Sequence, residues 1–288
     1  MRKLRAPLVL FSCILLVSQQ AGSSSPGACS SLKGDEKQTA ESIMAESYPY
    51  GCCDKTIDKC LKEKKVCKLA VRLAGEICMR VSKGESKDDI KTALSRRANS
   101  MMASGKKYEI DTGALDTWAG DEVSKVTLVA YVCARCPYCA KIMPKLYSKV
   151  TEGELKGKVK LHVKIFPIKG HESSGEGGKA MAAAAQKGKF WPFMLKLYGS
   201  FKDFDVSKLS TWAKDAGMVK GDFEKLMKSK QTETLVVNSK KEGLKNGVEG
   251  TPTFFINGRK YKADQKLTYF VDALLEEHDR LTGVEYEK

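Results

Sequence analysis

The residues best suited to chemistry are two cysteines in the segment Cys136-Pro137-Tyr138-Cys139. The segment follows an apolar, β-branched run, residues 125–132, and leads into residues 139–150, whose composition is helical. We therefore expect a strand, a turn and a helix whose first turn carries both sulfurs. Free N–H groups and the helix dipole favour negative charge there, and the thiolate is the reactive form of cysteine. The pattern predicts thiol–disulfide exchange, with Cys136 as the nucleophile and Cys139 covered one turn into the helix.

The neighbours of this pair leave other interpretations open. Arg135 could add positive charge next to the first sulfur. Cys133 extends the spacing to Cys133-x-x-Cys136-x-x-Cys139, which could also hold a soft metal or an iron–sulfur cluster. A structural disulfide or half of a zinc site is the alternative for the pair itself. The interpretation of Cys133 that we adopt is a small, half-buried thiol at the end of the strand, with no metal bound.

Two further motifs accompany the cysteines. Pro144 lies eight residues after Cys136, and the segment from Gly250 to Gly258 reads GTPTFFING. In combination with the cysteine pair, these motifs resemble the thioredoxin superfamily and, within it, the DsbA-like disulfide oxidoreductases of the bacterial periplasm. The resemblance covers about residues 106–288 and implies that Pro144 kinks the active-site helix. It also implies that Pro252 follows a cis peptide bond opposite the sulfurs, with Thr251 and Pro252 holding a substrate strand.

Two features bear on the direction of the redox reaction. The resemblance implies a buried acid six residues before Cys136, but that position is Ala130, so proton transfer to Cys139 would need water or another group. Thr251 is similar to the isomerase and reductase branch, whereas a helical block after the second strand, which includes residues 188–191, is similar to the insertion of the oxidases. Pro137 and Tyr138 would influence the reduction potential without fixing it. The direction therefore stays open.

The start of the chain predicts export. Basic residues within positions 1–5 precede an apolar run at 6–17 and a small polar stretch at 19–25, which is typical of a secretory signal peptide. We expect residues 1–22 to be the signal peptide and residues 23–37 to be a flexible linker. An uncleaved anchor and a lipid-modified cysteine are alternatives. Export to the periplasm or a similar oxidising compartment would allow disulfides to persist.

Residues 38–104 are expected to form a small, all-helical, cysteine-rich domain. Apolar residues recur every three or four positions over 66–81, and Ser86 is a predicted N-cap for the next helix. The preferred interpretation is a module stapled by disulfides, with a metal site or a second redox centre as alternatives. Adjacent Cys52 and Cys53 are not expected to pair with each other. Connectivity does not follow from spacing. Seven cysteines remain outside the Cys136–Cys139 pair in the mature chain, so one should be free, lipidated or intermolecular; dimerisation through this region is one option.

The fold class predicted for the whole chain is α/β. A thioredoxin-like domain at 105–288, with a helical insertion at about 175–247, would follow the cysteine-rich domain. The 288 residues carry a formal net charge of +15, but the lysine-rich stretches are interpreted as solvated faces, and no nucleic acid partner is expected. No cofactor is implied. We expect an enzyme that exchanges disulfides with protein thiols and needs a redox partner. A scaffold or binding protein, or a metal carrier, is the alternative.

Overall fold

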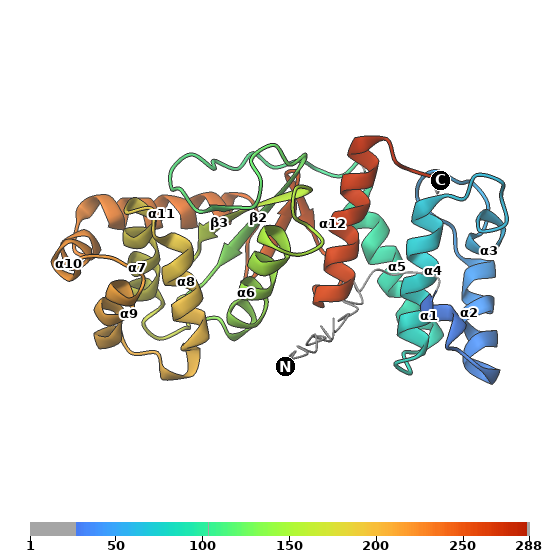
Figure 1. Cartoon of the computed structure of the whole chain (residues 1–288), viewed down its shortest axis with the longest axis horizontal. Helices are drawn as coiled ribbons and strands as arrows, with labels where there is room; N and C mark the ends of the chain where they lie inside the picture. The colour runs from blue at the N-terminus through green and yellow to red at the C-terminus, as the bar shows by residue number, and fades with distance from the viewer. Residues whose placement is uncertain (1–26, 103, 287–288) are drawn as a thin grey trace, which may run out of the picture.

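A five-stranded sheet forms the centre of the computed structural model, which describes residues 27–102 and 104–286 (Figure 1). The predicted signal peptide lies outside these residues. The strand order is β1-β3-β2-β4-β5; β2 and β3 are parallel and the other pairs are antiparallel. The strands are β1 (Trp118–Ala119), β2 (Val126–Val132), β3 (Val159–Ile165), β4 (Thr253–Ile256) and β5 (Arg259–Tyr261). The strand predicted over residues 125–132 is therefore confirmed as β2, whereas the two-residue β1 was not foreseen.

Both faces of the sheet are covered, which explains why its central strand is apolar throughout. On one face, alternate residues of β2 such as Leu128 and Ala130 pack with side chains of α6 (Pro137–Thr151) and α12 (Leu267–Thr282). On the other face, Val129 and Tyr131 pack with Phe166, Val248 and Phe255. The carboxyl end of β2 is thus held rigidly where it leads into α6.

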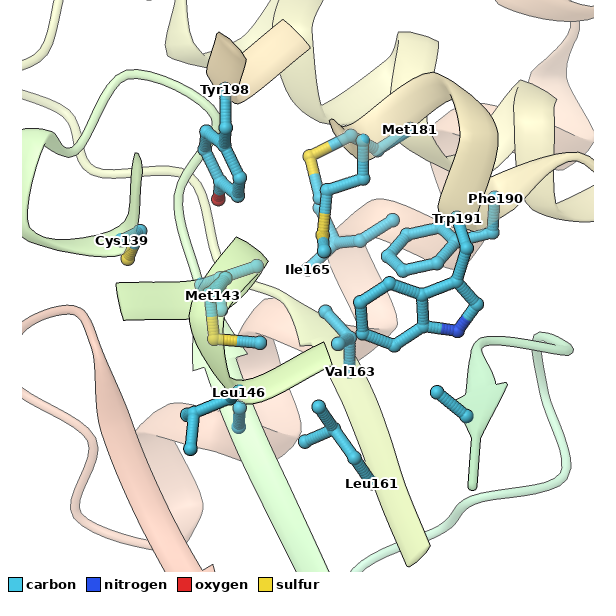
Figure 2. Packing of buried hydrophobic residues seen from close by; sticks show 14 of the residues in the cluster. Cys139, Met143, Leu146, Leu161, Val163, Ile165, Met181, Phe190, Trp191 and Tyr198 are labelled. Atoms are coloured by element: carbon cyan, nitrogen blue, oxygen red, sulfur yellow. The ribbon is translucent and has the colours of Figure 1, made fainter. Parts of the chain in front are cut away.

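The predicted insertion is helical and lies at one end of the molecule (Figure 1). It comprises α7 (Ser174–Gln186), α8 (Phe190–Gly199), α9 (Leu209–Asp215), α10 (Lys220–Met227) and α11 (Lys230–Lys245), with short 3₁₀ turns between α8 and α9. The aromatic residues of α8 are buried, as their helical spacing predicted. Figure 2 shows Phe190 and Trp191 packed close to Val163 and Ile165 of β3. The insertion therefore extends the same core in which the cysteine pair lies.

The N-terminal region is helical, with α1 (Gly27–Ser30), α2 (Gly34–Glu46), α3 (Ile57–Cys60), α4 (Lys68–Val81) and α5 (Lys87–Met101). Three disulfides join its cysteines: Cys29–Cys78, Cys52–Cys67 and Cys53–Cys60. This confirms the stapled helical region, and its six cysteines are not free to bind a metal. The prediction of a flexible linker at 23–37 is wrong from Gly27 onward, because Cys29 bonds α4 and Leu32 is buried in the core of this region.

Contacts between the N-terminal region and α12 are extensive and charged. Arg97 of α5 is buried and forms ion pairs with Glu76 of α4 at 2.7 Å, and with Asp272 and Glu276 of α12 at 2.6 and 2.7 Å. Near the end of the chain, Glu285 accepts a backbone hydrogen bond from Lys68 at 2.9 Å. The helical region is therefore fixed against the helix that covers the central sheet. Within the described residues no helix has the length and apolarity needed to span a bilayer.

Candidate active site

The backbone places Cys136 at the N-cap of α6. Strand β2 ends at Val132, three residues form a turn, and α6 begins with Pro137, which fits the first helical position because its nitrogen needs no partner. The Cys139 backbone N–H donates to the Cys136 sulfur at 3.5 Å, so the sulfur takes the role of a capping group. The predicted strand–turn–helix arrangement is thus present, and one sulfur faces free N–H groups.

Hydrogen bonds lower the pKa of Cys136 to about 5, from an ordinary value of 9.0. The largest cause is a hydrogen bond from the Cys139 side chain, which outweighs the opposing effect of burial. The Thr251 side chain and the backbone N–H groups of Cys139 and Tyr138 act in the same direction. At neutral pH, Cys136 is therefore a thiolate.

Cys139 behaves in the opposite way. It is fully buried, and burial raises its pKa well above the ordinary range; the neighbouring Cys136 sulfur raises it further. A carboxylate cannot assist it from β2, because Ala130 is the residue there and is buried among apolar side chains. The pair thus combines a thiolate with a protonated thiol that donates a hydrogen bond to it. The pair therefore has one sulfur that can act as a nucleophile at neutral pH and one that cannot.

The loop before β4 lies against the sulfurs. The Thr251–Pro252 peptide bond is cis, as expected from the resemblance. As a thiol, Cys136 donates a hydrogen bond to the Thr251 carbonyl oxygen at 3.0 Å. The buried Thr251 hydroxyl makes no other hydrogen bond within the described residues, which leaves it free to donate to the Cys136 thiolate. The structure therefore brings Thr251 and Pro252 to the cysteine pair from more than 100 residues away in the sequence.

A groove lies along α6, between Tyr138, the cis-proline loop and the start of α12. Its volume is about 360 Å³, and Tyr138, 72% exposed, stands at its edge. The groove is lined by residues of α6, of the cis-proline loop and of the segment between β5 and α12: Tyr138, Lys141, Ile142, Lys145, Pro252, Asp264, Gln265, Lys266 and Leu267. Cys136 itself is only 1% exposed. A client sulfur would therefore reach it by way of the surface that Tyr138 and Pro252 share.

The Arg135 side chain points toward the helical insertion. Its guanidinium lies over the rings of Phe204 at 4.4 Å and Phe201 at 5.3 Å, and Nη1 donates to the Phe201 carbonyl oxygen at 3.4 Å. These contacts anchor the turn before α6 to the helical insertion. An effect of this cation on the Cys136 pKa stays a prediction.

Two contacts close to the cysteine pair were not predicted: one between Cys133 and His171, and one made by the Tyr198 hydroxyl. Cys133 is buried, rather than half-buried as expected, and its sulfur lies 3.4 Å from Nδ1 of His171. The Tyr198 hydroxyl donates to the Cys133 carbonyl oxygen at 3.2 Å and interacts with the Cys139 side chain (Figure 2). The helical spacing of Phe190, Trp191, Phe193 and Tyr198 is typical of core aromatic residues, but it says nothing about where the Tyr198 hydroxyl points.

Cys133, Cys136 and Cys139 are all free thiols. No group of three or more His, Cys, Asp or Glu side chains in the described ranges has the arrangement of a metal site. The cysteine spacing that suggested a metal or an iron–sulfur cluster thus does not become a ligand cluster in this part of the chain.

A model of the thioredoxin family matches residues 114–276, more than half of the chain. Among solved structures, oxidised BdbD from Bacillus subtilis has a TM-score of 0.53 at 18% identity, covering 61% of this chain and 98% of its own. The α-DsbA1 protein of Wolbachia pipientis has a TM-score of 0.51 at 17% identity, covering 62% and 97%. The catalytic domain of Proteus mirabilis ScsC has a TM-score of 0.50 at 19% identity, covering 65% and 98%. At these identities the likeness establishes the fold.

Curated sequence relatives are longer proteins. The Na⁺/H⁺ antiporter NhaA 3 of Salinispora tropica is 24% identical over 142 residues, which are 49% of this chain and 22% of the relative. The antiporter NhaA 1 of Mycobacterium sp. strain KMS is 25% identical over 159 residues, covering 54% and 25%. The chain therefore spans about a quarter of the length of these relatives.

Proposed function

The chain belongs to the thioredoxin family, with a DsbA-like fold, and we propose that it is an exported protein thiol–disulfide oxidoreductase. One observation carries the proposal. Beside a cis-proline loop, Cys136 is held as a thiolate, while its neighbour Cys139 is buried and protonated. The proposed roles are catalytic for these two sulfurs, substrate-binding for Thr251 and Pro252, and modulating for Arg135, Pro137 and Tyr138.

The proposed reaction starts from a Cys136–Cys139 disulfide. A client thiolate attacks the Cys136 sulfur, a mixed disulfide forms, and Cys139 leaves as a thiolate that takes up a proton. A second client thiolate then attacks the client sulfur of the mixed disulfide, and Cys136 leaves as a thiolate. The client loses two electrons and gains a disulfide, while the protein becomes a dithiol. A redox partner must remove the two electrons before the next cycle.

The oxidising direction is the one that the site favours. A low pKa at Cys136 stabilises the reduced protein, and stabilisation of the reduced form makes a disulfide a stronger oxidant. In the reverse direction, Cys136 would attack a client disulfide and Cys139 would have to resolve it. Cys139 would then need to lose a proton that burial holds firmly, with Ala130 in place of an acid. The Cys133 backbone and the Thr251 side chain favour the resulting thiolate, and the Tyr198 hydroxyl interacts with the same sulfur.

The proposed setting follows from the chain's cysteines and its start. Three disulfides in the N-terminal region suit an oxidising compartment, and the predicted signal peptide suits export to the periplasm. We assign residues 27–104 to the cysteine-rich domain, which extends the predicted range of 38–104 to include Cys29, and residues 105–288 to the catalytic domain. The substrates would be protein thiols or disulfides. Dimerisation through the cysteine-rich domain stays a prediction.

Two measurements on the purified protein test this function. Equilibration with glutathione buffers should give a reduction potential nearer to about −120 mV than to about −270 mV, and a value near −270 mV would overturn the oxidising direction. Oxidation of a dithiol peptide, with glutathione disulfide as the terminal oxidant, should be lost in Cys136→Ser and retained in Cys133→Ala. If Cys136→Ser retained full activity, the alternative of a scaffold protein would replace the enzyme.

A further inference from the structure

The charges around the groove beside the cysteine pair are mainly positive. Lys141 and Lys145 lie one helical turn apart on the exposed face of α6 and form no ion pair within the described residues. Lys266, 64% exposed, lies across the groove at the start of α12 and has Glu85 as a neighbour at 3.8 Å. Three ammonium groups therefore border a channel that begins at Pro252.

The single acidic residue in the groove lining is already neutralised. Asp264 forms ion pairs with Arg80, whose Nη2 lies 3.3 Å from the carboxylate, and with Lys266, whose Nζ lies 3.9 Å from it. Arg80 comes from α4 of the N-terminal region, and its guanidinium is stacked on the Tyr269 ring at 4.0 Å. The contacts of Arg80 hold the segment between β5 and α12 in place. Because Asp264 is already paired with Arg80 and Lys266, it does not provide a counter-charge for Lys141 or Lys145.

The base of the groove is apolar. Ile142 is buried, and Leu267 and Pro252 are partly exposed. Such a channel fits an extended polypeptide that rests on apolar side chains and whose acidic groups reach Lys141 and Lys145, the two lysines without a counter-charge among the described residues.

We propose that this groove binds an acidic, extended segment of the protein client, next to the client cysteine that reacts with Cys136. The inference rests on the proposed function and names the substrate class of the same site. Lys141 and Lys145 follow Cys136 by five and nine residues, so they lie about 7 and about 13 Å further along the helix axis. An extended chain advances about 3.3 Å per residue. Carboxylates about two and four residues from the client cysteine would therefore meet the two lysines.

The experiment measures formation of the mixed disulfide directly. The full chain carrying Cys139→Ser is mixed with peptides whose single cysteine is activated as a 2-pyridyl disulfide. The Cys136 thiolate attacks the peptide sulfur, a protein–peptide disulfide forms, and 2-thiopyridone leaves and is followed by its absorbance. One peptide has glutamates two and four residues from the cysteine on both sides. Matched peptides have glutamine or lysine there, or carry the same glutamates at least eight residues away.

Every rate constant is divided by that of the same protein with 2,2′-dithiodipyridine, which removes differences in the intrinsic reactivity of Cys136. At low ionic strength, the near-glutamate peptide should react about fivefold faster than the glutamine peptide, because each exposed ion pair contributes only modestly. The advantage should fall in 0.5 M salt. Lys141→Glu/Lys145→Glu should reverse the order of the glutamate and lysine peptides.

The matched control is Lys225→Glu/Lys228→Glu. These two exposed lysines lie at the end of α10, in the insertion and away from α12 (Figure 1), and the double variant changes the net charge by the same amount. It should keep the preference for the near-glutamate peptide. Equal rates for all peptides, or an equal loss of preference in both double variants, would overturn the acidic-segment proposal. Absence of reaction with 2,2′-dithiodipyridine would instead overturn the proposed function.

Discussion

The N-terminal region and the central domain each bury three cysteines, but only the central domain leaves its cysteines free: Cys60, Cys67 and Cys78 are disulfide-bonded, whereas Cys133, Cys136 and Cys139 are not. Cys67 and Cys136 make the sharpest comparison, because each occupies the N-cap of a helix and each is 1% exposed. The Cys67 sulfur is bonded to Cys52 and accepts no capping hydrogen bond from α4, whereas the Cys136 sulfur accepts one from the N–H of Cys139. Burial and helix position alone therefore do not make a cysteine reactive. Reactivity also needs donors aimed at the sulfur and a partner thiol that can close or open a disulfide in place.

The largest expected difference between the two regions is in reduction potential. The Cys136–Cys139 disulfide should lie near about −120 mV, and the three N-terminal disulfides below about −300 mV, as structural disulfides do. After equilibration at −200 mV, alkylation and mass spectrometry should find Cys136 and Cys139 reduced and the other three pairs intact. Reduction of the Cys52–Cys67 disulfide in parallel with the active pair would contradict the distinction.

The next effect concerns the ion pairs that join the two regions. Arg97→Met should lower the free energy of unfolding by about 3–5 kcal/mol, because it leaves Glu276 buried without a cation and removes one of the two cations that pair with Glu76 and with Asp272. The neighbouring Arg96 is exposed, so Arg96→Met is the matched control and should change stability by less than about 0.5 kcal/mol. Urea unfolding measures both. Equal stability of the two variants would show that the network does not join the regions energetically.

Disulfides in the N-terminal region should stabilise according to the length of chain they close. In the chain-entropy model, losing Cys29–Cys78, with a separation of 49, costs about 4 kcal/mol, and losing Cys53–Cys60, with a separation of 7, costs about 2 kcal/mol. Paired Cys→Ser variants, unfolded in urea, test this order. In both variants the alkylation rate of Cys136 should match that of the parent protein. A changed rate would mean that the two regions are not chemically independent.

A further effect, which is small at any one pH step, is a pH dependence of stability that only the reduced protein should show. The Cys136 pKa is about 5 in the folded protein and about 9 when unfolded, so its thiolate stabilises the fold fully above pH 9. This contribution is lost as the pH falls through 5. The oxidised protein lacks the group, so the stability of the reduced form relative to the oxidised form should rise by about 1.4 kcal/mol per pH unit between pH 5 and 8.

Cys139 sets the upper limit of that pH window. The Cys139 pKa is higher in the folded protein than in the unfolded chain, so its contribution to folding stability is present below the unfolded pKa and is lost as the pH rises above it. The pH dependence from Cys139 is therefore opposite to that from Cys136, but it begins only at higher pH. Urea unfolding of both redox forms at pH 4, 6 and 8 measures the difference. An unchanged difference across this range would contradict a lowered pKa at Cys136.

Local patterns in the sequence were sufficient for most of the fold. The strands at 126–132 and 159–165 are readable because both of their faces are buried, and the turn at Asn257 and Gly258 is readable because both residues have positive φ. Ser86 caps α5 as predicted, through a hydrogen bond from the Asp89 N–H. The linker prediction was wrong because Ser/Gly composition does not reveal that Cys29 has a partner 49 residues away.

The site was predictable only where local chemistry defines it. Cys136 and Cys139 lie three residues apart, and the cis-proline segment has its own motif. Tyr198 and Lys266 reach the site from the insertion and from the start of α12, so only tertiary structure shows them. The same limit applies to Arg97, whose partners on α12 lie more than 170 residues away in the sequence.

Alkylation of the reduced protein tests the central claim most directly. The rate of Cys136 carboxamidomethylation by iodoacetamide, followed by mass spectrometry from pH 3 to 9, should titrate with a midpoint near pH 5. Cys133 and Cys139 should stay unlabelled through neutral pH, because burial raises the pKa of both thiols, whereas that of Cys136 is lowered. A midpoint near pH 9 for Cys136, or labelling of Cys139 at a similar rate, would contradict the assignment of Cys136 as the thiolate nucleophile.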